Sequence, residues 1–422
     1  MYKEINKCRI CGNTDLVSLL NLGEQTLTGV FPRSKDQLIT KGPLELVKCQ
    51  EDKDGNSCGL LQLRHSYDLN ELYGENYGYR SALNKSMVDH LQGKIKKILN
   101  MIHLAPGDLI LDIGSNDGTL LKAYPHDGLI LVGIDPTGKK FKGYYPDYIQ
   151  LISDFFSAGI VKQNFGKKKA KIITSIAMFY DLEAPMDFMR QVYEVLADDG
   201  IWVFEQSYMP TMLEMNAYDT ICHEHLEYYC LKQIKWMTDR IGFKIIDVEF
   251  NDVNGGSFSI TVAKPNSSYK ECTSRVDEIL SNEENIGLNT LKPYQEFKQR
   301  TFKHRDKLRQ FIKKIKANNK LMLGYGASTK GNVILQFCNI TEEDIPFMAE
   351  VNEDKFGCFT PGTNIPIISE KKAKKMKPDY FLVMPWHFKK NFLVREKKYL
   401  DNGGKLVMPL PKVEIINKQI LR

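Results

Sequence analysis

The sequence lacks both a strong excess of charge of one sign and a long uninterrupted run of apolar residues. Its 58 Lys and Arg residues nearly balance its 52 Asp and Glu residues, so the formal net charge is only +6 over 422 residues. Without a concentrated basic patch, this charge argues against a nucleic-acid-binding protein, although it suits an anionic small substrate. The N-terminal stretch MYKEINKCRICG has no apolar core like that of a signal peptide, and no run is long enough to cross a membrane. We therefore expect a cytoplasmic protein without a membrane partner.

The chain has nine cysteines, which in a cytoplasmic protein are better explained as metal ligands or free thiols than as disulfides. Cys8 and Cys11 form a C-x-x-C pair, and Cys49 and Cys58 form a second pair, separated by the polar insert QEDKDGNS. Four thiolates make the closed, structural form of a zinc site, which a short domain with a small core needs. A redox-active dithiol is the alternative for the first pair, but it leaves the second pair unexplained.

Residues 108–120, DLILDIGSNDGTL, organise the rest of the chain. The apolar residues Leu109, Leu111 and Ile113 alternate and predict a buried strand, which leads into a glycine loop and then a helix. The loop motif is D-x-G-x-x-x-G, not the G-x-G-x-x-G of dinucleotide-binding proteins. Asp112 is badly placed for a pyrophosphate, whereas Asp135, at the end of the next strand, suits the two hydroxyls of a ribose. The stretch resembles the S-adenosylmethionine site of class I methyltransferases; an ordinary strand-to-helix turn is the alternative.

Strands and helical stretches alternate through residues 108–265, which predicts an α/β fold with a doubly wound sheet. Its last two strands are joined by NDVNGG and read as a hairpin. Ligands bind beyond the carboxyl ends of strands in such sheets, so this edge should hold the cofactor. The cofactor-binding residues that we expect are Asp112, Gly114, Ser115, Asn116, Gly118, Asp135, Asp154, Phe155 and Ser175.

The segment YMPTMLEMNAYDTICHEHLEYYC feeds into the same edge and is the densest polar and aromatic cluster in the sequence. Its H-E-H tripeptide, His223 to His225, lacks the H-E-x-x-H spacing of a zinc-binding helix, so we expect no metal here. A histidine beside a carboxylate suits general base catalysis, because its unperturbed pKa is about 6.5. A buried histidine that only satisfies its hydrogen bonds is the alternative for either one alone.

Tyr73, Tyr77 and Tyr79 crowd beside two glycines ahead of an amphipathic helix, where they would either line a pocket or pack on a neighbouring domain. Residues 266–320 predict a helical connector. Residues 321–422 begin with LMLGYGASTKGNVILQF, a second strand, glycine loop and helix, where Lys330 and Asn332 would hold a diphosphate. Glu350, after the next strand, keeps a dinucleotide site open as an alternative.

Taken together, the chain resembles the S-adenosylmethionine-dependent C-methyltransferases of deoxysugar biosynthesis. The resemblance covers essentially the full length and rests on the four-cysteine segment, YGYRS, LDIGSNDG, CHEHLEYY, NDVNGGSF, GYGASTKGN and PGTNIPI. It implies a zinc-binding domain, a methyltransferase domain and a Rossmann-like C-terminal domain. We place these at residues 1–65, 66–265 and 321–422, with the helical connector at 266–320. The substrate it implies is a nucleotide-linked 4-keto-6-deoxy sugar.

The resemblance also implies roles for single residues. His225 matches the family's proposed base, with Glu224 and Tyr77 nearby. The substrate-binding residues that we expect are Tyr79, His223, Asn254, Lys330 and Asn332. The chain departs from the family where Cys222 replaces a common tyrosine, and where AMFYDLE replaces a stretch that commonly carries a histidine. These departures leave the sugar and the methylated carbon open.

The expected chemistry is removal of a proton from the carbon beside a sugar ketone, followed by attack of the resulting enolate on the sulfonium methyl group. A hydrogen-bond donor would stabilise the enolate oxygen. We expect a monomer or small homo-oligomer. One rival function is a nucleotide-sugar dehydrogenase or epimerase with NAD at the C-terminal glycine loop, which leaves D-x-G-x-x-x-G unexplained. A zinc-ribbon module that binds nucleic acid is the other rival, and the small net charge disfavours it.

Overall fold

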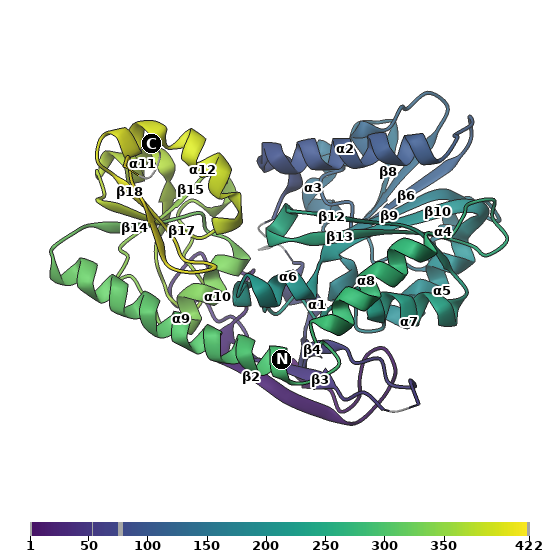
Figure 1. Cartoon of the computed structure of the whole chain (residues 1–422). Coiled ribbons are helices and arrows are strands. Elements are labelled where there is room, and N and C mark those ends of the chain that lie inside the picture. Colours follow the sequence, from purple (N-terminus) through teal and green to yellow (C-terminus); the bar gives the residue numbers. More distant parts are fainter. Residues whose placement is uncertain (1, 53, 75–78, 420–422) are drawn as a thin grey trace.

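The computed structural model describes residues 2–52, 54–74 and 79–419 (Figure 1). Two α/β bodies lie side by side, each built on its own sheet, and a smaller N-terminal sheet lies below them. The long helix α9 (Lys292–Ala317) runs from the C-terminal body toward the N-terminal sheet. Within the described residues, the structure contains no helix that combines the length and the apolar character needed to span a membrane.

The middle body contains a seven-stranded sheet in the order β8-β7-β6-β9-β10-β13-β12. The strands are β6 (Leu109–Ile113), β7 (Ile130–Ile134), β8 (Ile149–Ile152), β9 (Ala170–Ile176), β10 (Leu196–Ser207), β12 (Lys244–Asn251) and β13 (Ser257–Ala263). β6, β7, β8, β9 and β10 are parallel to one another, and β13 runs antiparallel to both of its neighbours, β10 and β12. The expected doubly wound sheet and terminal hairpin are therefore confirmed. The strand order reverses between β6 and β9, so the glycine loop after β6 lies at the switch point, where such sheets bind ligands.

The helices of the middle body cover both faces of this sheet. They are α2 (Lys85–Met101), α3 (Gly138–Phe141), α4 (Ala158–Phe165), α5 (Pro185–Val195), α6 (Met209–Glu214), α7 (Leu231–Ile241) and α8 (Thr273–Asn285). The helix expected directly after the glycine loop is wrong, because only one 3₁₀ turn, Leu121–Ala123, forms there. Pro125 restricts Tyr124 to an extended backbone and so stops a helix from growing.

The N-terminal sheet has the order β11-β4-β3-β2. Its strands are β2 (Leu16–Thr26), β3 (Lys41–Cys49), β4 (Leu61–Leu63) and β11 (Glu227–Tyr228), and β1 (Tyr2–Glu4) pairs separately with β5 (His65–Tyr67) ahead of α1 (Leu69–Leu72). β11 comes from the H-E-H segment of the middle body and pairs antiparallel with β4. Segments far apart in the sequence thus complete one sheet beside the candidate site.

The C-terminal body has a six-stranded sheet in the order β16-β15-β14-β17-β18-β19. Its strands are β14 (Met322–Tyr325), β15 (Met348–Glu350), β16 (Ile367–Ser369), β17 (Tyr380–Val383), β18 (Lys405–Met408) and β19 (Glu414–Ile416), and its helices are α10 (Thr329–Phe337), α11 (Glu370–Lys375), α12 (Lys389–Arg395) and α13 (Lys397–Asp401). On α9 the apolar stripe of Leu308, Ile312 and Ile315 is buried, as its spacing predicts. One apolar core joins this sheet to β2, β3 and α6, so the C-terminal body and the N-terminal sheet pack as a unit.

Candidate active site

The four N-terminal cysteines converge on one point. The sulfur atoms of Cys8, Cys11, Cys49 and Cys58 all lie within 4.8 Å of one another, and two of the Sγ–Sγ distances are 3.5 Å. A tetrahedral zinc ion with Zn–S bonds of about 2.3 Å separates its sulfur ligands by about 3.8 Å, so the cluster fits zinc. Three of the cysteines are buried, as a structural site requires.

The glycine loop after β6 turns through backbone conformations that L-residues rarely adopt. Gly114 and Gly118 have φ angles of 77° and 71°, and Asn116 has 50°. A Cβ on Gly114 would lie 3.1 Å from the Met178 side chain, so the loop packs tightly against the segment that follows β9. This closeness and the positive φ angles require glycine at both positions.

Two buried carboxylates lie beneath this loop. Asp135 accepts hydrogen bonds from the backbone N–H groups of Asn116 and Thr137, both at 2.7 Å, and so ties the loop to the end of β7. The Thr137 hydroxyl donates a third hydrogen bond, to the same Asp135 oxygen as the Thr137 N–H. A carboxylate offers about four lone-pair sites, so the Oδ2 atom that accepts from Asn116 keeps capacity for a ribose hydroxyl. Asp112 accepts a hydrogen bond from the Thr174 hydroxyl at 2.6 Å, and burial raises the pKa of its carboxyl to about 7.

The other expected cofactor residues differ in environment. Asp154 and Phe155 are both exposed beyond β8. Ser115 donates or accepts a hydrogen bond with Tyr145 at 2.8 Å. Ser175 is fully buried and its hydroxyl accepts a hydrogen bond from the Trp202 indole at 3.1 Å, so this side chain belongs to the interior of the sheet.

The segment 79–82 packs on the glycine loop. The Asn116 side chain accepts a hydrogen bond from the Ser81 N–H at 3.0 Å and donates one to the Tyr79 carbonyl at 3.3 Å. The Tyr79 side chain is 47% exposed beside the loop. Tyr77, which the sequence places near the base, lies outside the described residues.

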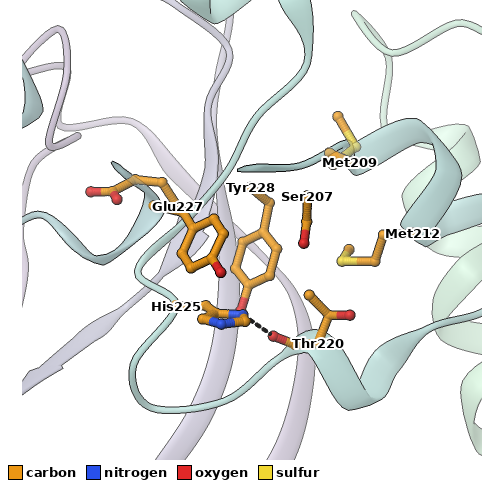
Figure 2. A pocket seen from close by; sticks show the side chains of 8 residues that line it. Ser207, Met209, Met212, Thr220, His225, Glu227 and Tyr228 are labelled. Carbon is orange, nitrogen blue, oxygen red and sulfur yellow. Dashed lines mark hydrogen bonds between the residues drawn. The ribbon is translucent and has the colours of Figure 1, made fainter. Parts of the chain in front are cut away.

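His225 lines a small pocket between the end of β10, α6 and β11 (Figure 2). Its Nδ1–H donates a hydrogen bond to the Thr220 carbonyl at 2.9 Å, and its ring lies 4.3 Å from that of Tyr180 between centroids. Burial and the charge of Lys330 lower the pKa of His225 to about 3. The imidazole is therefore neutral near pH 7, and with Nδ1 protonated its Nε2 is the proton acceptor.

The two residues before His225 in the chain, His223 and Glu224, pack against the N-terminal part of the chain, at Thr28, Gly29 and Tyr67. His223 is fully buried, its Nδ1 accepts from the Thr28 N–H at 3.3 Å, and its ring meets Tyr67 edge-on at 4.6 Å. The Glu224 carboxylate lies against Gly29, where a Cβ would come within 2.0 Å of its Oε1. Burial raises the pKa of the Glu224 carboxyl. The His223 Nε2 atom has no hydrogen-bond partner among the described residues, and the substrate role expected for this residue stays a prediction.

Lys330, on α10 of the C-terminal body, reaches the loop of the β12–β13 hairpin in the middle body. Its ammonium donates a hydrogen bond to the Asn254 carbonyl at 3.0 Å, which joins α10 to the loop of the β12–β13 hairpin. The same charge opposes protonation of His225 and His387, and it opposes the rise that burial causes in the pKa of Asp219. The structure thus brings together His225, Asn254 and Lys330, which the sequence places far apart.

In the C-terminal body, Asn332 and Glu350, which the sequence proposes as ligand-binding residues, both form hydrogen bonds within the protein. Asn332 is buried and donates its amide to the Thr28 carbonyl at 2.8 Å, so it fastens α10 to the N-terminal segment, and its expected contact with a diphosphate stays a prediction. Glu350 accepts from the backbone N–H of Ala327 in the glycine loop at 2.8 Å. Its other oxygen accepts from the N–H groups of the two residues that follow it. Glu350 thus joins the glycine loop to the turn after β15.

Sequence reasoning missed several residues around His225. Asp219 accepts a hydrogen bond from the Trp386 indole at 2.7 Å, and its other oxygen is buried without a hydrogen-bond partner among the described residues. The buried Tyr228 hydroxyl is likewise unpartnered there, and its ring extends toward His225 (Figure 2). Position in the CHEHLEYY segment was a usable signal for Tyr228, whereas no sequence pattern links Asp219 to Trp386.

Comparisons with known proteins agree with this three-part arrangement. Family models match in succession: a zinc binding domain at residues 8–73, a methyltransferase domain at 87–248 and a C-methyltransferase C-terminal domain at 252–411. The chain is 30% identical over 423 residues to the C-methyltransferase NovU of Streptomyces niveus, an alignment that covers 99% of each chain. The chain belongs to this C-methyltransferase family. As a family member it is an S-adenosylmethionine-dependent methyltransferase of the class I α/β fold with a structural zinc site.

Solved structures resemble parts of this C-methyltransferase. A chain from the complex of the Haloferax volcanii Trm112 methyltransferase activator with a methyltransferase is 14% identical, with a TM-score of 0.36 over 43% of this chain and 94% of that one. The magnesium protoporphyrin IX methyltransferase of Synechocystis PCC 6803 is 12% identical, with a TM-score of 0.31 over 42% of this chain and 78% of that one. At these TM-scores the likeness supports no further argument.

Proposed function

We propose that this C-methyltransferase methylates a nucleotide-linked 4-keto-6-deoxy sugar at C3, the carbon beside the ketone, and that His225 removes the proton from that carbon. The observation that carries the proposal is the place of the His225 imidazole in the pocket, with its Nδ1–H held by the Thr220 carbonyl so that Nε2 is the proton-accepting nitrogen. Burial and the charge of Lys330 lower the pKa of His225, which keeps the ring neutral near pH 7. A carbon nucleophile requires such a base, because a C–H beside a ketone must first lose its proton.

The cofactor loop and His225 are linked by one short segment after β9. Met178 packs against Gly114 in the glycine loop, and two residues later the Tyr180 ring packs on His225. The Tyr180 carbonyl also accepts a hydrogen bond from the Leu226 N–H at 2.8 Å. This connection supports a single cleft in which S-adenosylmethionine and the acceptor carbon meet.

S-adenosylmethionine, when bound, supplies an electrophilic methyl group. We assign its binding to Asp112 and Asp135 beneath the glycine loop, to the loop backbone at 114–118, and to Asp154 and Phe155 beyond β8. Ser175 is left out because its hydroxyl is bonded inside the sheet. Asp135 would accept a hydrogen bond from a ribose hydroxyl, and the exposed Phe155 ring would stack on the adenine.

Lys330, Asn254 and Tyr79 are the residues that we assign to the sugar. The Lys330 ammonium, close enough to act on His225, would stabilise the negative charge that develops on the ketone oxygen when the proton leaves. This role replaces the diphosphate contact expected from the sequence, because Lys330 points to the hairpin loop at Asn254. A soluble nucleotide sugar also fits action in the cytoplasm by a monomer or small oligomer.

The test measures methyl transfer and solvent-deuterium exchange with nucleotide-linked 4-keto-6-deoxy sugars. Because general bases contribute about 10²- to 10⁴-fold, His225→Asn should lose that much turnover and stop exchange at the carbon beside the ketone. Binding of S-adenosylmethionine, measured by calorimetry, should be unchanged. His126→Asn is the matched control, since the His126 side chain is 60% exposed and lies outside the pocket. Exchange at the normal rate in His225→Asn would remove His225 from the role.

A further inference from the structure

Arg9 lies inside the zinc loop, between Cys8 and Cys11, yet its side chain is directed away from the sulfur cluster. The guanidinium is 2% exposed and is held on several sides. Nη1 donates to the Leu63 carbonyl at 2.6 Å, and Nη2 donates to the Ser66 hydroxyl at 2.7 Å and the His65 carbonyl at 3.4 Å. Arg9 therefore fixes β4 and β5 to the metal loop.

The strand that Arg9 fixes, β4, is paired with the strand that follows His225 in the chain, β11. β4 pairs with β11, and the Leu63 N–H donates a hydrogen bond to the Leu226 carbonyl at 2.9 Å. Leu226 is the neighbour of His225. The same Leu63 therefore accepts from Arg9 through its carbonyl and holds the residue after His225 through its N–H.

A second contact reaches the same segment. The Arg9 Nε lies 3.9 Å from a carboxylate oxygen of Glu227, whose side chain is fully buried. Neither oxygen of Glu227 has a hydrogen-bond partner among the described residues. The other acid near Arg9, Glu183 at 3.7 Å, has a side chain that is 45% exposed and therefore accessible to water. Burial raises the pKa of the Glu227 carboxyl and the charge of Arg9 opposes that rise, so the guanidinium is the group that favours a carboxylate at this buried position.

We propose that Arg9 is a positioning residue that connects the zinc loop to the His225 segment. Metal binding orders the C-x-x-C loop, and the ordered loop fixes the position of Arg9. Arg9 in turn holds β4 and Glu227. Because β4 pairs with β11, this contact keeps His225 in its position in the pocket. The proposal rests on the proposed role of His225 for its effect on turnover, but its structural part stands on contacts of Arg9 alone. In this proposal the zinc domain contributes to the reaction by positioning His225, although the zinc ion does not contact the substrate.

The test compares Arg9→Met with Arg9→Lys and with Arg64→Met in the full-length zinc-loaded enzyme. Arg64 is the matched control, because it lies next to Leu63 but its guanidinium pairs with Glu4 and Glu45. Misplacement of a catalytic group by about 1 Å costs roughly 10²-fold in rate, so Arg9→Met should lose about that in kcat. Its affinity for S-adenosylmethionine should stay unchanged. Arg9→Lys should recover part of the loss, and Arg64→Met should retain normal turnover.

Amide hydrogen exchange supplies a readout that needs no substrate. Arg9→Met should raise exchange over residues 220–228 and leave the glycine loop at 112–118 unchanged, with one zinc ion per chain retained. Normal exchange over 220–228, or loss of zinc from the variant, would overturn the proposal. If exchange rises as expected but His225→Asn remains active, the proposed base is wrong and the role of Arg9 in ordering the segment stands.

Discussion

At the scale of single residues, His225 is set apart from its neighbours by the direction in which it faces. Burial lowers the pKa of His223, His225 and His387 to about 3, so all three are neutral near pH 7. Only His225, however, combines that state with a place in the pocket and a hydrogen bond that directs its Nδ1 proton to a carbonyl. The candidate base therefore differs from the buried His223 in the direction of its side chain: His225 lines the pocket, whereas His223 packs against Thr28 and Tyr67.

The charge of Lys330 should be visible in the pH dependence of turnover. Because burial and, after it, this charge lower the pKa of His225, the wild-type enzyme should keep its proton-abstraction rate as the pH falls through 6.5. Lys330→Met removes the charge, so the pKa of His225 should rise and the acidic loss of rate should move to higher pH. Lys330→Arg keeps the charge and should keep the acidic limb where it is. Deuterium exchange across a pH series measures this limb, and an unmoved limb in Lys330→Met would contradict the assignment.

Asp135 should carry much of the affinity for S-adenosylmethionine. Hydrogen bonds to charged groups contribute about 1.5 to 3 kcal/mol each, so Asp135→Ala should weaken binding about 10- to 100-fold or more in calorimetry. The loss includes the loop itself, since Asp135 also holds the Asn116 N–H. Asp127→Ala is the control, because the Asp127 side chain is fully exposed. Equal affinity in both variants would place the ribose elsewhere.

At the scale of elements, the loop at residues 27–31 and the H-E-H segment fit together without spare room. Gly29 faces the Glu224 carboxylate, which leaves no space for a methyl group. Thr28 supplies the N–H that His223 accepts and the carbonyl to which Asn332 donates. All three parts of the chain meet at this loop, which carries no sequence motif of its own.

Gly29→Ala tests this fit. The new Cβ would overlap the Glu224 carboxylate, so that side chain must move, whereas the backbone of Gly29 tolerates alanine. Overpacking costs about 1 to 3 kcal/mol, so the protein should remain folded while methyl transfer falls. Gly143→Ala adds the same methyl group in open space and should have no effect on either. Thermal unfolding and turnover of the two variants decide the matter, and normal turnover in Gly29→Ala would show that Glu224 is not needed where it lies.

The sequence predicted elements well where the pattern is local. The strand before the glycine loop, the terminal hairpin and the buried stripe on α9 each follow from spacing within a few residues. Prediction was wrong at the helix after Gly118, where Pro125 acts from several residues away. It also missed Asp219 with Trp386, because that contact exists only once the middle and C-terminal bodies are packed. Local periodicity reveals elements, whereas long-range contacts depend on packing that one sequence does not display.

At the scale of the whole molecule, the zinc site should stabilise more than its own loop. Cys49→Ala removes one of four ligands, and structural zinc sites contribute directly to folding free energy. We expect loss of zinc, a lower unfolding temperature and faster amide exchange in β3, β4 and β11 together. Cys272→Ala removes a free cysteine outside the cluster and should leave the zinc content unchanged. Elemental analysis beside thermal unfolding measures both, and full zinc in Cys49→Ala would contradict the four-cysteine site.

The pairing of β11 with β4 has a consequence for how the chain is made and how it can be rearranged. The N-terminal sheet stays open at one edge until residues 227–228 have left the ribosome, more than 160 residues after β4. An unpaired sheet edge can form hydrogen bonds with strands of other chains, so the nascent chain passes through an aggregation-prone intermediate. A chimera that exchanges residues 1–65 between relatives would separate two halves of one sheet. Recombination should succeed only where the donor carries its H-E-H segment along with its zinc loop.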